Sequence, residues 1–189
     1  MKLVLATRNP DKIKEIKSIL KDTRYQLIPL EKIVPKLFVT ETEPNLDGNA
    51  RKKALSTMRA TKLSTLAEDT GLEVYALGGE PGVRSARYAG SNAKHEKNIK
   101  KLLKNMQSIP NNQRLARFRT VFALAIPGKT VRVFEGICFG KIAKEPKGKF
   151  GFGYDPIFIP KSYKLTFGQL STKTKNRISH RAKALKKVK

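Results

Sequence analysis

The sequence has little of what builds disulfide-linked, membrane-spanning or aromatic-rich proteins. Its single cysteine, Cys138, excludes a disulfide within the chain and a metal cage built from cysteines alone. It has no tryptophan, and aromatic residues make up 7% of it. No apolar run approaches the ~20 residues that span a bilayer, and the apolar start of the chain is too short for a signal peptide. These absences predict a cytoplasmic protein that does not enter membranes.

Acidic residues are also scarce. Asp and Glu number 15 against 40 Lys and Arg, which leaves a net charge of +25. Such a field attracts polyanions, among them RNA, DNA, anionic lipid and nucleoside triphosphates. A general excess of basic residues without a specific partner explains the same charge, so both interpretations stay open. We expect nucleic acid to bind through this non-specific charge only.

The length of the chain suits one large domain. Its 189 residues are near the usual size of a domain, and a chain of this length buries enough surface to fold without cross-links. No Gly/Ser linker and no internal repeat divides it. We therefore expect a single domain over residues 1–189, built from two lobes that share a core.

The hydrophobic pattern alternates strands and helices early and ends in a long hairpin followed by a basic helix. The expected elements are strands over residues 2–6, 25–29 and 63–67, helices after Pro10, around Leu46–Met58 and around Ile99–Met106, hairpin strands over 118–126 and 131–139, and a last helix from near Ser179. This order predicts a mixed α/β (α+β) fold with a central mixed sheet flanked by helices.

A polar turn, Thr7–Lys12, separates the first strand from the first helix. The start of a helix attracts phosphate because its backbone N–H groups lack partners within the helix. Thr7 and Asn9 add neutral donors there, and Lys12 adds positive charge. The turn lacks the glycine pattern of a Walker loop. Capping of the helix by Asn9 or Asp11 explains the same residues.

Two adjacent carboxylates, Glu68 and Asp69, follow the apolar strand 63–67. The carboxyl end of a strand is where open α/β sheets place their ligands. Magnesium takes a few carboxylates together with water and phosphate oxygens, and Glu41 and Glu43 could complete such a site from a separate loop. A capped turn with no metal explains Glu68 and Asp69 as well.

Two later segments have the composition of a base-binding site. The glycines that flank Phe152 allow a flat ligand to approach, and the rings of Phe152 and Tyr154 could stack on a base. His180 and Arg181 fall in the first turn of the last helix, where cations oppose the helix dipole, so an anion or a base edge is expected beside them. A core aromatic pair and a structural histidine are the alternatives.

Taken in order, these segments resemble the inosine triphosphate pyrophosphatase family, whose members hydrolyse non-standard purine nucleoside triphosphates. The matching segments are Ala6–Lys12, Asn49–Ala54, Ala67–Val74, Leu77–Gly82, Ser85–Tyr88, Gly151–Pro156 and Ile178–Arg181. They cover nearly the whole chain. One departure is Gly48, because most relatives carry a glutamate just before the Asn-Ala pair, and its absence removes one metal or water ligand.

The resemblance implies an elongated, two-lobed protein with a cleft between the lobes, usually a homodimer, that converts ITP, dITP and XTP to the monophosphate and pyrophosphate. It implies Asp69 as the catalytic base and a magnesium ion, or manganese in its place, held by Asp69 and Glu41. By motif position, the triphosphate would be held by Thr7, Arg8, Asn9, Pro10, Asp11, Lys12 and Lys53, and the nucleotide by Thr70, Phe152, Gly153, Tyr154, Asp155, Lys175, His180 and Arg181.

Base selection has a simple physical requirement. Inosine and xanthosine carry a carbonyl acceptor at ring position six, whereas adenine carries an amino donor there. Donors from His180 or Arg181 would pair with the carbonyl and oppose adenine. A basic RNA- or DNA-binding protein, and a related pyrophosphatase for other modified nucleotides, are the alternative functions.

Overall fold

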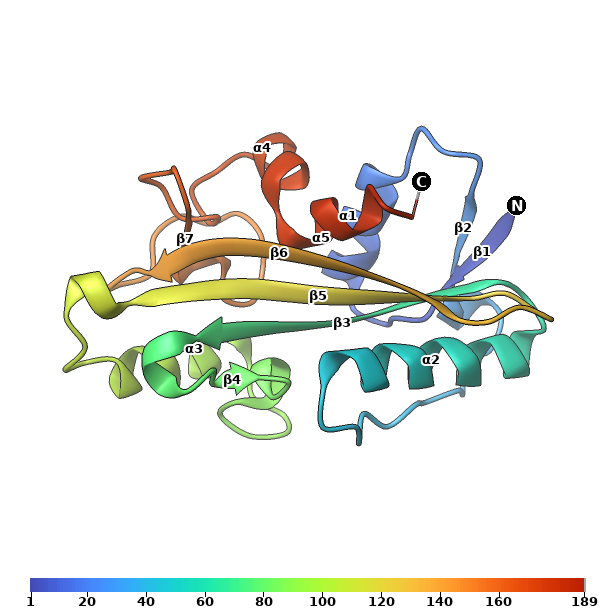
Figure 1. Cartoon of the computed structure of the whole chain (residues 1–189), viewed down its shortest axis with the longest axis horizontal. Helices are drawn as coiled ribbons and strands as arrows, with labels where there is room; N and C mark the ends of the chain where they lie inside the picture. Colours follow the sequence, from blue (N-terminus) through green and yellow to red (C-terminus); the bar gives the residue numbers. More distant parts are fainter. Residues whose placement is uncertain (189) are drawn as a thin grey trace. The chain divides into compact units, whose positions relative to one another are not determined.

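The computed structural model describes residues 1–188 and contains a seven-stranded sheet (Figure 1). The strands are β1 (Lys2–Leu5), β2 (Gln26–Pro29), β3 (Thr65–Val74), β4 (Pro81–Gly82), β5 (Leu115–Ala125), β6 (Arg132–Ile142) and β7 (Phe158–Pro160). The α-helices of these residues are α1 (Pro10–Ile19), α2 (Leu46–Thr61), α3 (His95–Asn105), α4 (Thr172–Ile178) and α5 (His180–Leu185).

The sheet is mixed. Its order is β2-β1-β3-β5-β6-β7, and β4 pairs with β3. Strand β1 runs parallel to β2 and to β3, whereas β4 is antiparallel to β3 and β7 to β6. Parallel strands need a crossover connection. Helix α1 lies in the connection from β1 to its neighbour β2, and α2 lies in the connection from β2 past β1 to β3. The predicted mixed sheet with flanking helices is confirmed.

Contacts divide the chain into two compact units. Unit 1 consists of Met1–Asp69, Thr120–Gly136 and the C-terminal residues from Arg181, and unit 2 consists of Thr70–Arg119 and Ile137–His180. Strands β3, β5 and β6 each contribute residues to both units.

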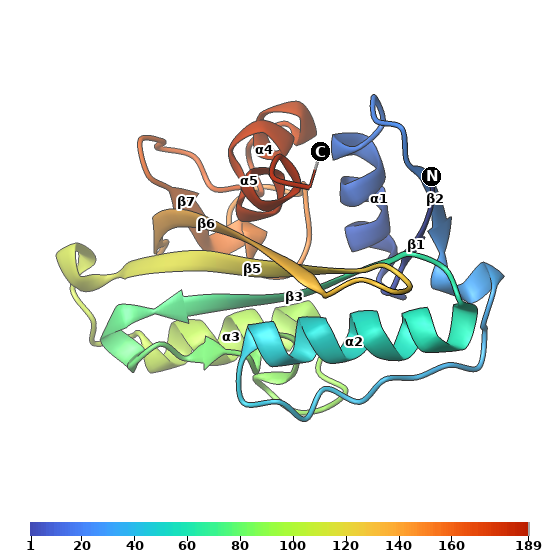
Figure 2. The same cartoon turned by 45° about the vertical axis from the view of Figure 1, so that its right-hand side comes forward.

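Unit 1 has helices on both faces of its strands. In both views α1 and the C-terminal helix lie on one side of β1 and the first half of β3, and α2 lies on the other (Figures 1 and 2). Its core includes Leu3, Leu66 and Phe122, all within 2% of full burial. Helix α1 begins as the sequence indicates, because Pro10 suits a first turn and the side chain of Asn9 accepts hydrogen bonds from the amides of Asp11 and Lys12.

Unit 2 is built around aromatic rings. Helices α3 and α4 lie on opposite sides of its strands (Figure 2). The ring of Phe118 on β5 contacts those of Phe158 on β7 and Phe167, with centroids 4.7 and 6.2 Å apart, and all three side chains are buried. Offset aromatic pairs of this kind contribute about 0.5–1.5 kcal/mol beyond the area that they bury.

The hydrophobic pattern placed the end of β3 wrongly. The strand was expected to stop at Ala67, but it continues to Val74, so Glu68 and Asp69 lie inside it and not at its carboxyl end. Both side chains are buried among charged partners, and a buried charge interrupts an apolar pattern without ending a strand. The sequence pattern also missed α4, β4 and β7. Among residues 1–188 no helix is both long and apolar enough to cross a bilayer.

Candidate active site

The candidate site of unit 1 is built on the two adjacent carboxylates of β3. Successive side chains of a strand point to opposite faces of the sheet. Glu68 accordingly contacts Lys12 on α1 and Arg181 on α5, and Asp69 contacts Asn49 and Lys53 on α2. Two neighbours in the sequence thus belong to two separate charged clusters.

The Glu68 cluster is an ion-pair network around two fully buried side chains, Glu68 and Arg181. Arg181 Nε and Nη2 donate to the two carboxylate oxygens of Glu68 at 2.8 and 3.1 Å, and Arg181 Nη1 donates to Glu15. Lys12 Nζ lies 2.9 Å from Glu68 Oε1. Burial by itself would raise the pKa of Glu68, but the charges and hydrogen bonds of Arg181 and Lys12 hold that pKa far below its ordinary value. Glu68 is therefore ionised near neutral pH.

The Asp69 cluster carries less compensating charge. Asp69 Oδ1 lies 3.6 Å from Lys53 Nζ, and Lys53 Nζ also pairs with Glu41 Oε1 at 2.5 Å. Asp69 Oδ2 accepts a hydrogen bond from Asn49 Nδ2 at 3.1 Å. Burial raises the pKa of Asp69, Lys53 lowers it, and the nearby Glu41 adds to the rise, so that the net pKa lies above the ordinary value. A buried carboxylate in this state can accept a proton.

Two of the predicted phosphate ligands already have protein partners. The guanidinium of Arg8 donates to the carbonyls of Pro35 and Leu37 and lies over the ring of Phe38, 4.3 Å from its centroid. Lys12 is held by Glu68. Asn9 caps α1, because its Oδ1 accepts from the amides of Asp11 and Lys12 at 2.9 and 3.1 Å.

In unit 2 three of the predicted nucleotide-binding residues, Phe152, Asp155 and Lys175, form a cluster around one buried ion pair. Lys175 Nζ pairs with Asp155 Oδ2, and the same oxygen accepts from the amide of Phe152 at 2.8 Å. Lys175 Nζ also lies 4.9 Å from the centroid of the Phe152 ring. Gly151 permits this packing: it has φ +73°, and a Cβ there would lie 2.0 Å from Asp155 Oδ2.

The two aromatic residues of that loop differ in exposure. Phe152 is half-buried, whereas Tyr154 is 5% exposed and its hydroxyl donates to the carbonyl of Ser85 at 2.9 Å. Tyr154 thus belongs to the core of unit 2, as the alternative interpretation has it. The neighbouring Gly153 has φ +62°.

The histidine and the threonine of the predicted set also lie in unit 2. The imidazole of His180 is buried and stacks on the ring of Phe118, with centroids 4.6 Å apart and an angle of 19° between the planes. Thr70 is the first residue of unit 2 and is half-buried.

Comparisons with known proteins identify the family of the chain. The model of the Ham1 family matches residues 3–189. The chain belongs to the Ham1 family. It is 44% identical over 185 residues to the dITP/XTP pyrophosphatase of Bacillus subtilis (strain 168), a match that covers 98% of this chain and 93% of that protein. It is 46% identical to the dITP/XTP pyrophosphatase of Desulforamulus reducens, over 100% of this chain and 94% of that protein.

A solved structure supports the same assignment. The Staphylococcus aureus Ham1 protein superposes with a TM-score of 0.89 at 39% identity, over 100% of this chain and 96% of the other. The resemblance drawn from the sequence motifs is therefore confirmed, and so is the fold class.

Within this Ham1-family chain the structure adds two residues that the sequence analysis gave no role. Glu15 lies on the buried side of α1 and pairs with Arg181. The unfavourable cation at the start of the last helix was the signal that could have found it, because that cation required an anion nearby. Asn49 is buried and bonded to Asp69, and its position in the motif Asn49–Ala54 was the signal that could have found it.

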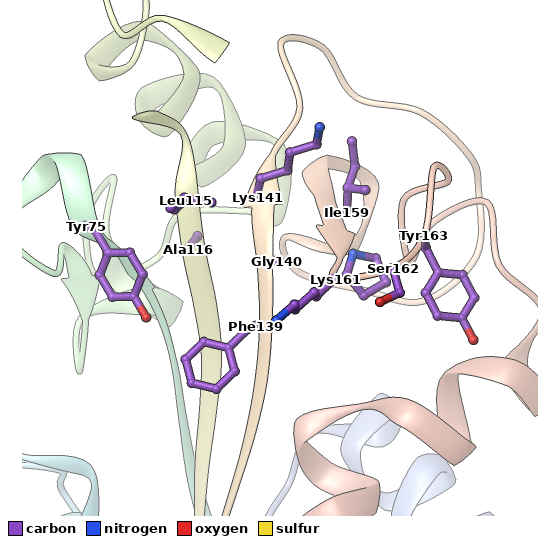
Figure 3. A pocket seen from close by; sticks show the side chains of 11 residues that line it. Tyr75, Leu115, Ala116, Phe139, Gly140, Lys141, Ile159, Lys161, Ser162 and Tyr163 are labelled. Atoms are coloured by element: carbon purple, nitrogen blue, oxygen red, sulfur yellow. The ribbon is translucent and has the colours of Figure 1, made fainter. Parts of the chain in front are cut away.

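The Ham1-family chain also has an apolar pocket in unit 2 that none of the predicted site residues line. It has a volume of about 550 Å³, and Tyr75, Leu115, Phe139, Ile159, Lys161 and Tyr163 are among its lining residues (Figure 3). The lining of this pocket contains no Asp or Glu. It therefore lacks the carboxylates expected of the hydrolytic site and is not the candidate catalytic site.

Proposed function

We propose that this chain hydrolyses dITP, ITP and XTP to the nucleoside monophosphate and pyrophosphate. Relatives that are 44% and 46% identical over nearly the whole chain are dITP/XTP pyrophosphatases. The observation that carries the proposal is the Asp69 cluster, in which a buried carboxylate of raised pKa shares the ammonium of Lys53 with Glu41.

Asp69 is proposed as the general base. A water oxygen attacks the α-phosphorus, the bond from that phosphorus to the oxygen bridging to the β-phosphorus breaks, and pyrophosphate leaves. The proton of the water passes to Asp69, whose raised pKa favours taking it up. A positioned base of this kind contributes about 10²–10⁴-fold to the rate.

Asp69 and Glu41 are proposed to hold a magnesium ion, for which manganese could substitute. Carboxylate oxygens suit a hard cation. The carboxylates of Asp69 and Glu41 both contact the ammonium of Lys53, so their surroundings already favour a positive charge. Residues 1–188 contain no group of three or more His, Cys, Asp or Glu side chains that could hold a metal. The two carboxylates would therefore share the ion with water and substrate phosphate oxygens. When bound, the ion would polarise the phosphate and neutralise its charge.

Lys12 and Lys53 are proposed to stabilise the charge of the leaving pyrophosphate. Phosphoryl transfer depends mainly on positioning and on electrostatic stabilisation. Lys12 is held by the buried Glu68, and Lys53 by Glu41 and Asp69, so both ammonium groups are fixed before substrate arrives. The turn Thr7–Lys12 and Arg8 are proposed to add contacts to the same phosphates.

The unit 2 cluster is proposed to hold the nucleotide through Phe152, Asp155, Lys175 and His180, with Thr70, Gly153 and Tyr154 beside them, and Arg181 is proposed to assist in recognising the base. Buried donors that pair with the six-carbonyl of a hypoxanthine or xanthine base lose a hydrogen bond with adenine. Such a mismatch can discriminate by about 10⁴-fold. We also propose a homodimer, which sedimentation equilibrium would test.

The activity is tested by the release of pyrophosphate from dITP, ITP, XTP, GTP and ATP at equal magnesium concentration. We expect dITP, ITP and XTP to be cleaved much faster than ATP. Equal rates for ITP and ATP would contradict the selectivity. Binding of RNA that depends steeply on salt, with no turnover of any triphosphate, would favour a nucleic-acid-binding protein instead.

The base is tested with Asp69→Asn. We expect kcat to fall about 10²–10⁴-fold while the affinity for nucleotide stays within a few-fold. Asp47→Asn is the matched control, because Asp47 is an exposed carboxylate of α2 paired with Arg51, and its kcat should equal that of the unchanged chain. Near-normal turnover by Asp69→Asn would rule out the role of Asp69.

A further inference from the structure

Asn49 is a polar side chain that the fold buries completely. It lies in the first turn region of α2, after the capping residue Asn45, and is 0% exposed. A buried amide without partners costs about 1–3 kcal/mol. Asn49 satisfies both of its polar atoms: Oδ1 accepts from the amide of Glu43 at 3.0 Å, and Nδ2 donates to Asp69 Oδ2 at 3.1 Å and to the carbonyl of Glu43 at 3.4 Å.

These hydrogen bonds form part of a network of polar contacts in unit 1. Lys53 follows Asn49 by four positions, so both side chains lie on the same face of α2. Lys53 contacts Asp69 Oδ1 and Glu41, while Asn49 contacts Asp69 Oδ2 and the backbone of Glu43. This network therefore links β3, α2 and the loop 41–43 through hydrogen bonds and ion pairs.

We propose that Asn49 is a positioning residue of the hydrolysis: it orients the carboxylate of Asp69 and anchors the loop that carries Glu41, so that both carboxylates face Lys53. This inference rests on the proposed function, because the base and the cation-binding pair are the groups that Asn49 positions. Asn49 itself transfers no proton.

The chemistry requires an amide at this position. One end of the side chain must accept a hydrogen bond from the Glu43 amide, and the other must donate to a carboxylate. Aspartate has the same shape but is acceptor-only when ionised. It can keep the first bond, but it replaces the second by a like charge beside Asp69. Alanine loses both. The two substitutions therefore separate the loop anchor from the orientation of Asp69.

The test measures kcat and KM for dITP together with amide hydrogen exchange at residues 41–45 of the full chain, without magnesium or nucleotide. For Asn49→Asp we expect the Glu43 amide to stay protected and kcat to fall about 10–100-fold, the loss expected for one hydrogen bond to a charged group. For Asn49→Ala we expect the Glu43 amide to lose protection and kcat to fall at least as far. KM should change by less than about threefold in both variants, since Asn49 contacts the proposed general base, Asp69, and is not proposed to contact the nucleotide.

Asn45→Asp is the matched control. It introduces the same change at the same end of α2, where Asn45 accepts a bond from the amide of Gly48 that aspartate can also accept. Its kcat and its exchange pattern should match those of the unchanged chain.

Two results would overturn the inference. One is a normal kcat in either Asn49→Asp or Asn49→Ala. The other is a fall in kcat for Asn49→Ala with full protection of the Glu43 amide, since the anchor would then have no part in catalysis. If Asn49→Asp does not fold, Asn49→Ala alone decides between these results. Failure here is distinct from failure of the proposed function: in the first case the unchanged chain still cleaves dITP and Asp69→Asn does not, whereas in the second either the unchanged chain cleaves no triphosphate or Asp69→Asn turns over almost normally.

Discussion

Glu68 and Asp69 are adjacent on β3, yet their surroundings shift their pKa values in opposite directions. Glu68 meets Arg181 and Lys12, and its pKa is lowered despite full burial. Burial raises the pKa of Asp69, and Glu41, a second carboxylate that shares the ammonium of Lys53, adds to the rise. Because both residues belong to one strand, the difference comes from the charged side chains that contact them, from α1 and α5 at Glu68 and from α2 and the loop 41–43 at Asp69.

This difference in pKa indicates a structural role for Glu68 and a chemical role for Asp69. A carboxylate that stays ionised anchors Lys12 and Arg181 but cannot exchange a proton near neutral pH. A carboxylate whose charged form is only partly compensated can accept a proton and attracts a cation. The Glu68 side therefore holds Lys12 and Arg181 in place, and the Asp69 side is where hydrolysis is proposed.

The largest expected contrast between the two sides is in stability. Glu68→Gln leaves the buried guanidinium of Arg181 with its Glu15 partner but without the bidentate carboxylate of Glu68. Removing one member of a buried ion pair costs about 3–5 kcal/mol, and we expect a loss of this size in the free energy of unfolding measured with urea. Asp69→Asn should change that free energy by less than about 1 kcal/mol.

The exposed pair Asp47–Arg51 provides the control for Glu68→Gln. Its side chains are 42% and 44% exposed, and surface pairs contribute about 0–1 kcal/mol. Equal losses for Glu68→Gln and Asp47→Asn would show that the Glu68 cluster does not support the fold.

A smaller contrast is expected in the pH dependence of stability. The unfolded chain binds a proton at Glu68 more readily than the folded chain does, so Glu68 stabilises the protein above its ordinary pKa of 4.5 and loses this effect as the pH falls. Asp69 has the opposite sign: the folded chain binds the proton more readily from 3.8 upward, so this residue's contribution falls as the pH rises through its raised pKa.

Urea unfolding of the unchanged chain, Glu68→Gln and Asp69→Asn between about pH 3 and pH 7 measures how the free energy of unfolding changes with pH for each residue. One proton changes this free energy by at most about 1.4 kcal/mol per pH unit. The stability difference between the unchanged chain and Glu68→Gln should grow with pH, and the difference from Asp69→Asn should shrink. The same sign for both would refute the comparison.

The smallest effect is expected from Gly48→Ala, because the added methyl group contacts only residues beside the Asp69 cluster. Alanine usually stabilises a helix by about 0.5–1 kcal/mol relative to glycine. Here the new Cβ would lie 2.8 Å from the Cβ of Glu43, whose backbone Asn49 holds. We expect the gain to be cancelled, with less than about 1 kcal/mol change in stability and a small fall in kcat. A more stable chain with unchanged kcat would show that the loop yields freely.

Local patterns predicted most helices and strands because their periodicity depends on neighbouring residues. The start of α1, the helix α2 and the hairpin of β5 and β6 follow from such patterns. The end of β3 could not be predicted in this way. Glu68 remains inside the strand because it pairs with Arg181, which is 113 positions away in the sequence.

The candidate residues were predicted for a different reason. The linear motifs mark Asp69, Lys12 and Arg181 as members of one family signature, but they do not say which of them touch. The structure joins Lys12 and Arg181 through Glu68, which the motifs left without a partner. It also joins the loop of Glu41 to Asp69 through Asn49.

By itself the sequence determined the family, the mixed α/β class, the positive charge and the residue types available for phosphate chemistry, because these depend on composition and on order along the chain. Only the tertiary structure decided which of two adjacent carboxylates is neutralised by a guanidinium and which keeps a raised pKa. The reason is that a pKa depends on burial and on the charges within a few ångströms, and folding brings those charges together from distant parts of the chain.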